Sequence, residues 1–209
     1  MAKILAFKGS QTPSPGNVLR KAPVRPKNSA VRSREHLTID EVEALMKVAG
    51  NTGRHCHRDR MLILMMFRHG LRVSEAIGLR WDQVDFNSGQ IHINRLKKGN
   101  ASTHYLEGDE MRGLRRLMRE STGNPFMFVT ERGGPLTRST VNKLVTRAGK
   151  LAEIEFPVHP HMFRHACGFY FANKGIDTRT IQDYLGHVSI THTVRYTHLS
   201  PQKFKGLWS

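Results

Sequence analysis

The sequence predicts an α+β domain that is mainly α-helical, with a small antiparallel sheet near its middle. Three observations support this class. Apolar residues recur at helical spacing over most of the chain after residue 37, and the stretch QIHINRL over 90–96 instead alternates like a strand. The 209 residues suffice for one domain with a core plus an arm, and the longest apolar run, MLILMMF over 61–67, is too short to span a bilayer.

The first helices carry clear start and stop signals. Residues 38–41, Thr-Ile-Asp-Glu, form a capping box, and the helix that follows is expected to end at Gly50. A second, strongly apolar helix is predicted over 58–69. Ser74 is then expected to cap a short helix that ends at Leu79.

The middle of the chain changes period. Residues 90–96 are predicted to form a strand, 97–102 a turn, and 103–106 the returning strand of a hairpin. A helix follows over 108–120. The apolar stretch 126–130, FMFVT, is either a third strand or a buried run.

Four further helices complete the prediction, and we find no internal repeat. The first opens at Thr137 and runs to about Leu151, and the others cover 161–173, 178–185 and about 189–198.

Residues 1–34 differ in composition from the rest of the chain. They contain no Asp or Glu, four prolines and eight basic residues. Such a segment cannot bury a core, so we expect a mostly disordered basic arm whose contacts are with phosphates. The basic residues of this arm that we expect to make these contacts are Arg20, Lys21, Arg25, Lys27, Arg32 and Arg34. The domain itself is predicted over 35–200, and 201–209 form a tail.

Charge is the strongest global signal. The formal net charge is +16 and the sequence pI is about 10.5, as expected of a chain that lies on a polyanion. RNA binding of the ribosomal type and a merely basic surface remain alternatives. The N-terminus lacks a secretory signal, and Cys56 and Cys167 lie far apart, so we expect a cytoplasmic protein with reduced, structural thiols.

Arg72 lies in the stretch GLRVSE, two residues after a glycine and just before a predicted helix. Backbone N–H groups and the positive end of a helix dipole converge there, which favours an anion. Glu75, three residues later, could orient the guanidinium. A structural arginine and an ordinary surface ion pair are the alternatives.

The stretch HPHMFRHACG places His161 and Arg164 three residues apart near the start of a helix. His161 and His165 could also be a metal pair, but no carboxylate lies nearby, and Arg164 would repel a cation. A phosphate fits better, because arginine offers a planar fork and a charged histidine a second donor.

The C-terminal region contains two tyrosines. Tyr184 falls on the apolar face of the helix over 178–185 and is predicted to be core. His187 follows on a loop, and Tyr196 comes nine residues later beside Arg195. Basic surroundings favour a phenolate, so Tyr196 is a candidate nucleophile.

From about residue 37 to 200 the chain resembles the tyrosine recombinase (phage integrase) family. The motifs that carry the resemblance occur in the family's order: GLRVSE (Arg72), KKGN (Lys98), HMFR (His161 and Arg164), LGH (His187) and RYTH (Tyr196). INRLKKGNASTH and IQDYLGH look most like the short Fim-type inverting recombinases that switch fimbrial promoters. The resemblance implies the catalytic domain of the DNA breaking-rejoining fold.

The resemblance also implies a site-specific recombinase that needs no metal or other cofactor. Tyr196 would attack a DNA phosphorus and form a 3′-phosphotyrosyl bond, while Arg72 and Arg164 would clamp the non-bridging oxygens. His161, together with Glu75, would help to orient and protonate the site. His187 would donate a hydrogen bond to the phosphate. Lys98 would reach the minor groove and protonate the leaving 5′ oxygen, and Lys97 is the competing candidate for this role.

The implied partners are double-stranded DNA, further copies of the chain in dimers and a tetramer on paired sites, and DNA-bending helper proteins. Most family members carry a separate core-binding domain. Here we expect the basic arm of residues 1–34 to take its place. The apolar side chains of the tail 201–209 are expected to dock on a neighbouring protomer or on their own domain. A DNA-binding regulator with little cleavage and a type IB topoisomerase are the alternative functions.

Overall fold

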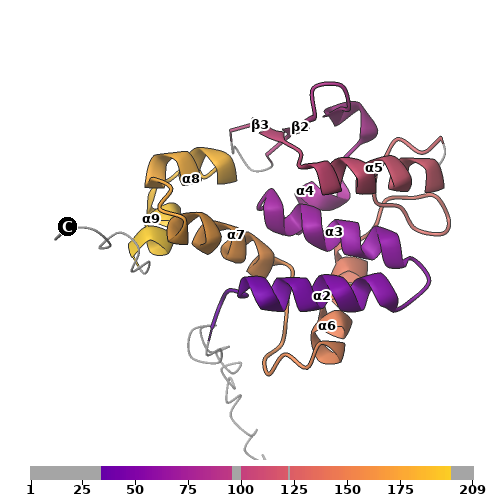
Figure 1. Ribbon diagram of the computed structural model, residues 1–209, viewed down its shortest axis with the longest axis horizontal. Coiled ribbons are helices and arrows are strands. Elements are labelled where there is room, and N and C mark those ends of the chain that lie inside the picture. The colour runs from indigo at the N-terminus through magenta and orange to yellow at the C-terminus, as the bar shows by residue number, and fades with distance from the viewer. Residues whose placement is uncertain (1–33, 96–99, 122, 199–209) are drawn as a thin grey trace, which may run out of the picture.

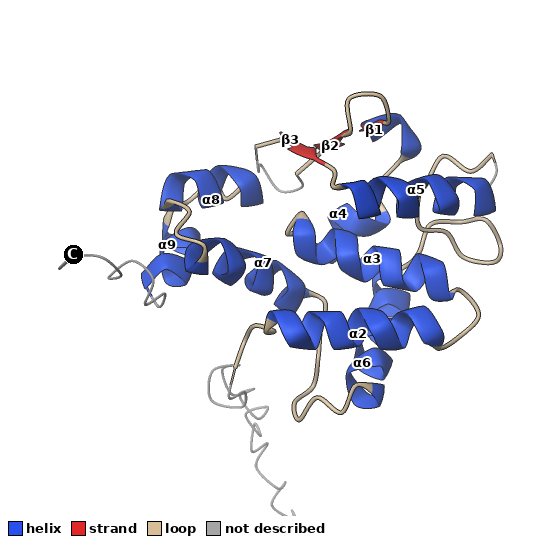
Figure 2. Cartoon of the chain, in the orientation of Figure 1, coloured by secondary structure: helices blue, strands red, loops and turns tan. Residues whose placement is uncertain are grey.

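Helices predominate in the computed structural model, which describes residues 34–95, 100–121 and 123–198 (Figures 1 and 2). A three-stranded sheet lies at one edge. The elements are α2 (Ile39–Asn51), α3 (Cys56–Arg68), α4 (Val73–Ile77), the 3-10 helix η1 (Trp81–Gln83), β1 (Val84–Asp85), β2 (Gln90–Ile93), β3 (Ser102–Tyr105), α5 (Gly108–Glu120), α6 (Arg138–Leu151), α7 (His161–Asn173), α8 (Thr178–Leu185) and α9 (Thr191–His198).

The helix α3 forms the centre of the core. Every residue from Met61 to Met66 is buried, which agrees with a helix that is apolar on all sides. The helices α2, α5 and α7 pack against it (Figure 1). The predicted capping box of α2 is confirmed: Thr38 Oγ1 accepts from the Glu41 N–H at 3.3 Å, and Glu41 Oε2 accepts from the Thr38 N–H at 2.7 Å.

The predicted cap of the short helix α4 is wrong. Arg72, rather than Ser74, occupies the N-cap position. The carboxylate of Glu75 accepts a hydrogen bond from the Arg72 backbone N–H at 2.9 Å. Glu75 thus satisfies the backbone N–H of the N-cap residue, and the helix begins two residues earlier than a cap at Ser74 would place it.

The sheet is antiparallel with strand order β1-β2-β3. The predicted hairpin is confirmed, with Ile93 of β2 opposite Ser102 of β3, whereas β1 was not predicted. In β2 the side chains of Ile91 and Ile93 are buried and His92 between them is exposed. The stretch 126–130 contributes the buried run rather than a full strand.

The helices α7, α8 and α9 pack on one another at one end of the molecule (Figure 1). The described bounds of α7 and α8 match the prediction, and α9 begins at Thr191 rather than Ser189. The helix α8 ends at Gly186, whose φ of 64° and ψ of 44° are left-handed. Among the described residues, no helix is both long and apolar enough to cross a membrane.

Candidate active site

Arg72 and Glu75 form the first part of the site, where α3 ends and α4 begins. Arg72 Nη1 donates to Glu75 Oε1 at 2.6 Å. The Arg72 side chain is 29% exposed, whereas that of Glu75 is 1% exposed. Burial alone would raise the pKa of Glu75, but the hydrogen bonds from Arg72 and the charge of Arg95 outweigh it and lower the pKa. A buried, ionised carboxylate therefore orients a guanidinium that reaches solvent.

Arg164 lies beneath this pair and is 1% exposed. Its Nη1 donates to Gly70 O and its Nη2 to Leu185 O, both at 2.6 Å, which fixes the plane of the fork. Glu75 Oε2 lies 4.0 Å away. Burial and the charges of Arg72 and Arg95 lower the pKa of Arg164 to about 10, so the guanidinium remains charged at neutral pH.

His161 and His187 lie close enough to Arg164 and Arg72 for the charges of the two guanidinium groups to lower their pKa values. Burial, followed by the charges of Arg164 and Arg72, lowers the pKa of His187 to about 3, and its Nδ1 lies 2.8 Å from Thr193 Oγ1. The side chain of His161 reaches solvent, yet desolvation and the charge of Arg164 lower its pKa to about 4. In the DNA-free chain the nearby cations thus disfavour protonation of both histidines, and a charged histidine donor to a bound phosphate stays a prediction.

Tyr196 is 1% exposed and packs in an apolar cluster, which the sequence did not indicate. Its hydroxyl lies 2.9 Å from His165 Nδ1, and its ring meets that of Phe169 edge-on at 5.1 Å. Burial raises the pKa of Tyr196 to about 12, and the opposing charges of Arg164 and Arg195 do not offset it. The basic neighbours act in the predicted direction, but burial outweighs them, so the predicted preference for the phenolate is wrong in this conformation.

Tyr184, by contrast, has the structural role expected of it. It is partly buried against the α7–α9 cluster, and its hydroxyl donates to Arg68 O at 2.9 Å. Burial raises the pKa of its phenol well above the ordinary value.

Several predicted residues fall outside the site or outside the described chain. Lys97, Lys98, Arg20, Lys21, Arg25, Lys27 and Arg32 and the tail 201–209 lie outside the described residues. Arg34 is described: it donates to Glu41 and lies over the ring of Phe156, 5.1 Å from its centroid. Its guanidinium is thus engaged within the domain, and its contact with DNA stays a prediction.

The histidine pair that suggested a metal has other contacts. The rings of His161 and His165 meet edge-on with centroids 4.5 Å apart, and His165 is bound to Tyr196. Across the described ranges, no three His, Cys, Asp or Glu side chains are grouped so as to hold a metal ion. Cys167 is buried, and burial raises the pKa of its thiol to about 12.

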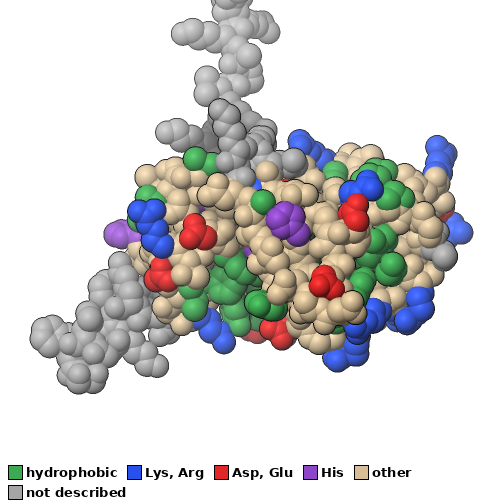
Figure 3. Space-filling view, turned by 90° about the horizontal axis from the view of Figure 1, so that it is seen from above, with side chains coloured by type: hydrophobic (Ala, Val, Ile, Leu, Met, Phe, Trp, Pro, Cys, Tyr) green, Lys and Arg blue, Asp and Glu red, His purple; other side chains and the backbone are tan. Residues whose placement is uncertain are grey.

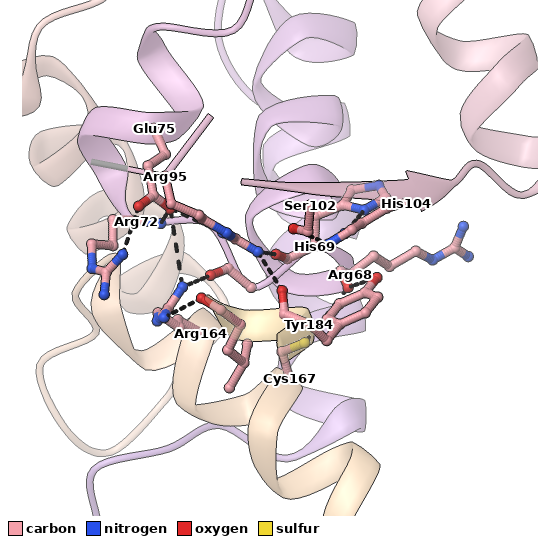
Figure 4. A network of polar contacts seen from close by, with 12 residues as sticks. Arg68, His69, Arg72, Glu75, Arg95, Ser102, His104, Arg164, Cys167 and Tyr184 are labelled. Carbon is pink, nitrogen blue, oxygen red and sulfur yellow. Dashed lines mark hydrogen bonds and ion pairs between the residues drawn. The ribbon is translucent and has the colours of Figure 1, made fainter. Parts of the chain in front are cut away.

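Arg95 is the residue of this region that the sequence reasoning missed. Its side chain is completely buried, and its Nη1 donates to Glu75 Oε2 at 3.0 Å (Figure 4). The alternation over the predicted strand 90–96 held the signal: Ile91, Ile93 and Arg95 are all buried, although β2 itself ends at Ile93. An arginine at an apolar phase of a strand indicates a buried partner of opposite charge.

Comparisons with known proteins agree on one relationship. Residues 35–203 match the family described as Phage integrase family. The chain is 42% identical over 182 residues to the Type 1 fimbriae regulatory protein FimB of Escherichia coli (strain K12), covering 85% of this chain and 90% of that protein. It is 31% identical over 197 residues to Tyrosine recombinase XerD of Mycobacterium tuberculosis (strain CDC 1551 / Oshkosh), covering 89% of this chain and 63% of that one.

Solved structures share the fold. The crystal structure of XerA recombinase matches with a TM-score of 0.70 and 26% identity, covering 81% of this chain and 62% of that one. The post-cleavage complex of the XerH site-specific recombinase bound to palindromic difH substrate matches with a TM-score of 0.72 and 23% identity, covering 86% of this chain and 54% of that one. This chain therefore spans about half to two thirds of the length of those structures.

Proposed function

The chain belongs to the phage integrase family of tyrosine site-specific recombinases, and we propose that Tyr196 is its nucleophile and that Arg72 and Arg164 bind the DNA phosphate it attacks. The phenolic oxygen forms a bond to phosphorus, the bond from phosphorus to the 5′ oxygen breaks, and a 3′-phosphotyrosyl linkage remains. The phenolic proton is lost, and the leaving 5′ oxygen gains one. Attack by a 5′-hydroxyl on the linkage rejoins the strand and releases the tyrosine.

The observation that carries this proposal is that two guanidinium groups converge on one buried carboxylate. Arg72 and Arg164 both lie within 4.0 Å of Glu75, and both influence the pKa of Tyr196. Negative charge builds on the non-bridging oxygens in the pentacoordinate transition state. Guanidinium groups held in place beforehand stabilise that charge without having to reorganise during the reaction.

The nucleophile has to leave its buried position before it reacts. In that position burial among apolar side chains keeps the Tyr196 hydroxyl neutral, and the hydroxyl is hydrogen-bonded to His165. When the phenol moves toward a bound phosphate, the cost of desolvation falls while the charges of Arg164 and Arg72 continue to favour ionisation. We infer that a movement of α9 on the DNA complex activates the tyrosine.

His161 and His187 are assigned to the phosphate, and Lys98 to the leaving oxygen. The phosphate anion opposes the cations that lower the two histidine pKa values, so its arrival favours their protonated, hydrogen-bond-donating forms. Lys98 protonates the 5′ oxygen in this proposal, with Lys97 as the alternative.

The proposed partners are double-stranded DNA and further copies of the chain, arranged as dimers and a tetramer on two sites in the cytoplasm of a bacterium. A net charge of +16 supports binding to DNA, and Lys and Arg side chains gather toward one end of the face shown in Figure 3. A lambda integrase dimer bound to a COC′ core site is among the structures that share the fold. DNA-bending helper proteins are further candidates.

Covalent trapping on nicked duplexes tests the assignment of Tyr196. Duplexes made from the DNA that flanks the gene are incubated with the protein, and protein–DNA adducts are resolved on a denaturing gel. We expect Tyr196→Phe to abolish the adduct and to leave binding unchanged, because only the hydroxyl is lost. Tyr184→Phe is the control and should still form it. An adduct with Tyr196→Phe would refute the assignment, and a DNA-bound wild-type protein without any adduct would favour the non-cleaving regulator.

A further inference from the structure

Arg95 duplicates the environment of Arg164. Both side chains are buried, and both connect the ends of the same two helices, α3 and α8 (Figure 4). At the end of α3, Arg95 Nη2 donates to His69 O at 3.2 Å and Arg164 Nη1 to Gly70 O at 2.6 Å. At the end of α8, Arg95 Nη2 donates to Tyr184 O and Arg164 Nη2 to Leu185 O, both at 2.6 Å.

Arg95 also acts on the carboxylate that orients Arg72. Glu75 Oε2 accepts from Arg95 Nη1 at 3.0 Å, and Glu75 Oε1 accepts from Arg72 Nη1 at 2.6 Å. The two arginines therefore hold opposite oxygens of one carboxylate. Because Arg95 is itself anchored to two helix ends, it fixes the rotation of Glu75 and, through it, the direction of the Arg72 fork.

The charges around Glu75 do not balance within the described chain. Three guanidinium groups, those of Arg72, Arg95 and Arg164, lie within 4.0 Å of this one carboxylate. Arg95 Nε is buried and has no hydrogen-bond partner among the described residues. Burying excess positive charge is costly, and an anion that binds beside this cluster of three arginines offsets that cost. A DNA phosphate supplies such an anion.

The stem of Arg95 lies against the loop that leads to His187. A Cβ atom added to Gly186 would come within 2.7 Å of Arg95 Cγ. The end of α8, the position of His187 and the stem of Arg95 are thus coupled by packing as well as by the hydrogen bond to Tyr184 O.

We propose that Arg95 is a positioning residue of the DNA phosphate site, which aligns Arg72 through Glu75 and adds positive charge behind the two clamp arginines. The proposal rests on the proposed function of Arg72 and Arg164. A purely structural role, in which Arg95 only joins α3 to α8, is the alternative that an experiment has to exclude.

Cleavage of two matched substrates separates these roles. One nicked duplex carries an ordinary phosphate at the scissile position, and the other carries a methylphosphonate, which lacks the negative charge. We expect Arg95→Met to slow adduct formation on the phosphate by about 10- to 100-fold, as for residues that orient a primary contact, and to slow it much less on the methylphosphonate. Arg95→Lys, which keeps the charge but not the fork, should recover part of the rate on the phosphate.

Two control variants, Arg58→Met and Arg72→Ala, are measured on the same two substrates. Arg58 is a largely buried arginine at the opposite end of α3 that donates to Val129 O at 2.7 Å. Arg58→Met should lower stability and leave the ratio of the two cleavage rates unchanged. Arg72→Ala should reduce that ratio, and if it does not, the proposed function of Arg72 fails whatever Arg95 does.

With Arg72→Ala behaving as expected, an Arg95→Met variant that slows both substrates equally would overturn the proposal for Arg95. If Arg95→Met does not fold, Arg95→Lys decides. A reduced ratio of phosphate to methylphosphonate cleavage in Arg95→Lys supports the proposal, and the wild-type ratio overturns it.

Discussion

Burial determines what the hydroxyl of Tyr196 can do in the DNA-free chain. Because burial raises its pKa to about 12, the hydroxyl stays protonated at pH 7. His165 does not compensate as a base, because burial and the charge of His161 lower its own pKa to about 3. A buried, protonated hydroxyl is a poor nucleophile, so on the proposed assignment Tyr196 is inactive in this conformation.

A methyl group at Gly168 should displace this tyrosine. A Cβ atom there would lie 2.6–2.8 Å from three ring atoms of Tyr196, so the ring must move. We expect Gly168→Ala to expose the phenol and to lower its pKa below about 12, as measured by NMR titration of tyrosine labelled with ¹³C at Cζ. Overpacking should also destabilise the fold by about 1–3 kcal/mol.

Gly149→Ala is the matched control, because its Cβ would meet Val158 at 2.7 Å and does not contact Tyr196. It should lower stability similarly and leave the titration of Tyr196 unchanged. A folded Gly168→Ala protein with an unaltered Tyr196 titration would show that the ring is not held as described.

At the scale of elements, the C-terminal end of α8 connects the parts of the site. Its last carbonyls accept hydrogen bonds from Arg95 and Arg164, an arrangement that the helix dipole favours. Gly186 then turns the chain in a left-handed conformation and leads directly to His187. The C-terminal end of one short helix thus contacts two buried arginines and leads into His187.

Substitution of Gly186 by alanine should impair both folding and cleavage. Gly186 and Gly175 have positive φ values of 64° and 79°, so alanine at either costs about 1 kcal/mol in backbone strain. At Gly175 nothing lies within 4 Å of the added Cβ, whereas at Gly186 the Cβ would also meet Arg95 Cγ. Urea unfolding should show a larger loss for Gly186→Ala, and single-turnover cleavage should fall for this variant alone. Equal effects of the two substitutions would contradict the packing argument.

For the molecule as a whole, buried neutral histidines make stability depend on pH. The pKa values of His104, His165 and His187 are lowered to about 3, chiefly by burial. In the unfolded chain each imidazole titrates near 6.5. Between these values the unfolded state binds more protons, so the free energy of unfolding rises with pH through this window and falls as the pH drops below about 6.5.

Urea unfolding at pH 7 and pH 5 should therefore give a clearly lower free energy of unfolding at pH 5. Each such histidine contributes up to about 1.4 kcal/mol per pH unit within the window. A folded His187→Asn variant should show a weaker dependence of the free energy of unfolding on pH, by up to about 1.4 kcal/mol per pH unit. Stability that is independent of pH between 7 and 5 would mean that these imidazoles are not buried as neutral groups.

The basic arm should act on DNA affinity rather than on folding. Residues 1–33 carry seven basic residues. Arg34 and Glu35 are instead bound to the domain, because Arg34 donates to Glu41 and Glu35 Oε2 accepts from Arg195 Nη2 at 2.7 Å. Deletion of 1–33 should leave thermal unfolding unchanged and weaken DNA binding. Each lost phosphate contact should reduce the log–log salt slope by roughly 0.9. A slope identical to that of the full chain would show that the arm does not touch DNA.

Local signals in the sequence determined most of the elements and the identity of the family. Caps, glycine stops and apolar periodicity depend on residues a few positions apart, so the bounds of α5, α7 and α8 could be predicted closely. The order and spacing of the motifs around Arg72, Arg164 and Tyr196 indicated the phage integrase family, which the comparisons confirm.

The tertiary structure alone decided how those residues are surrounded. Basic neighbours in the sequence suggested an ionised Tyr196, but desolvation depends on α7 and on the apolar cluster that pack around the ring. Arg95 lies twenty residues after its carboxylate partner Glu75 and 89 residues before Tyr184, whose carbonyl it binds. Charge, burial and hydrogen bonding between distant segments arise only when the chain is packed, and they decide which residues are charged and where they point.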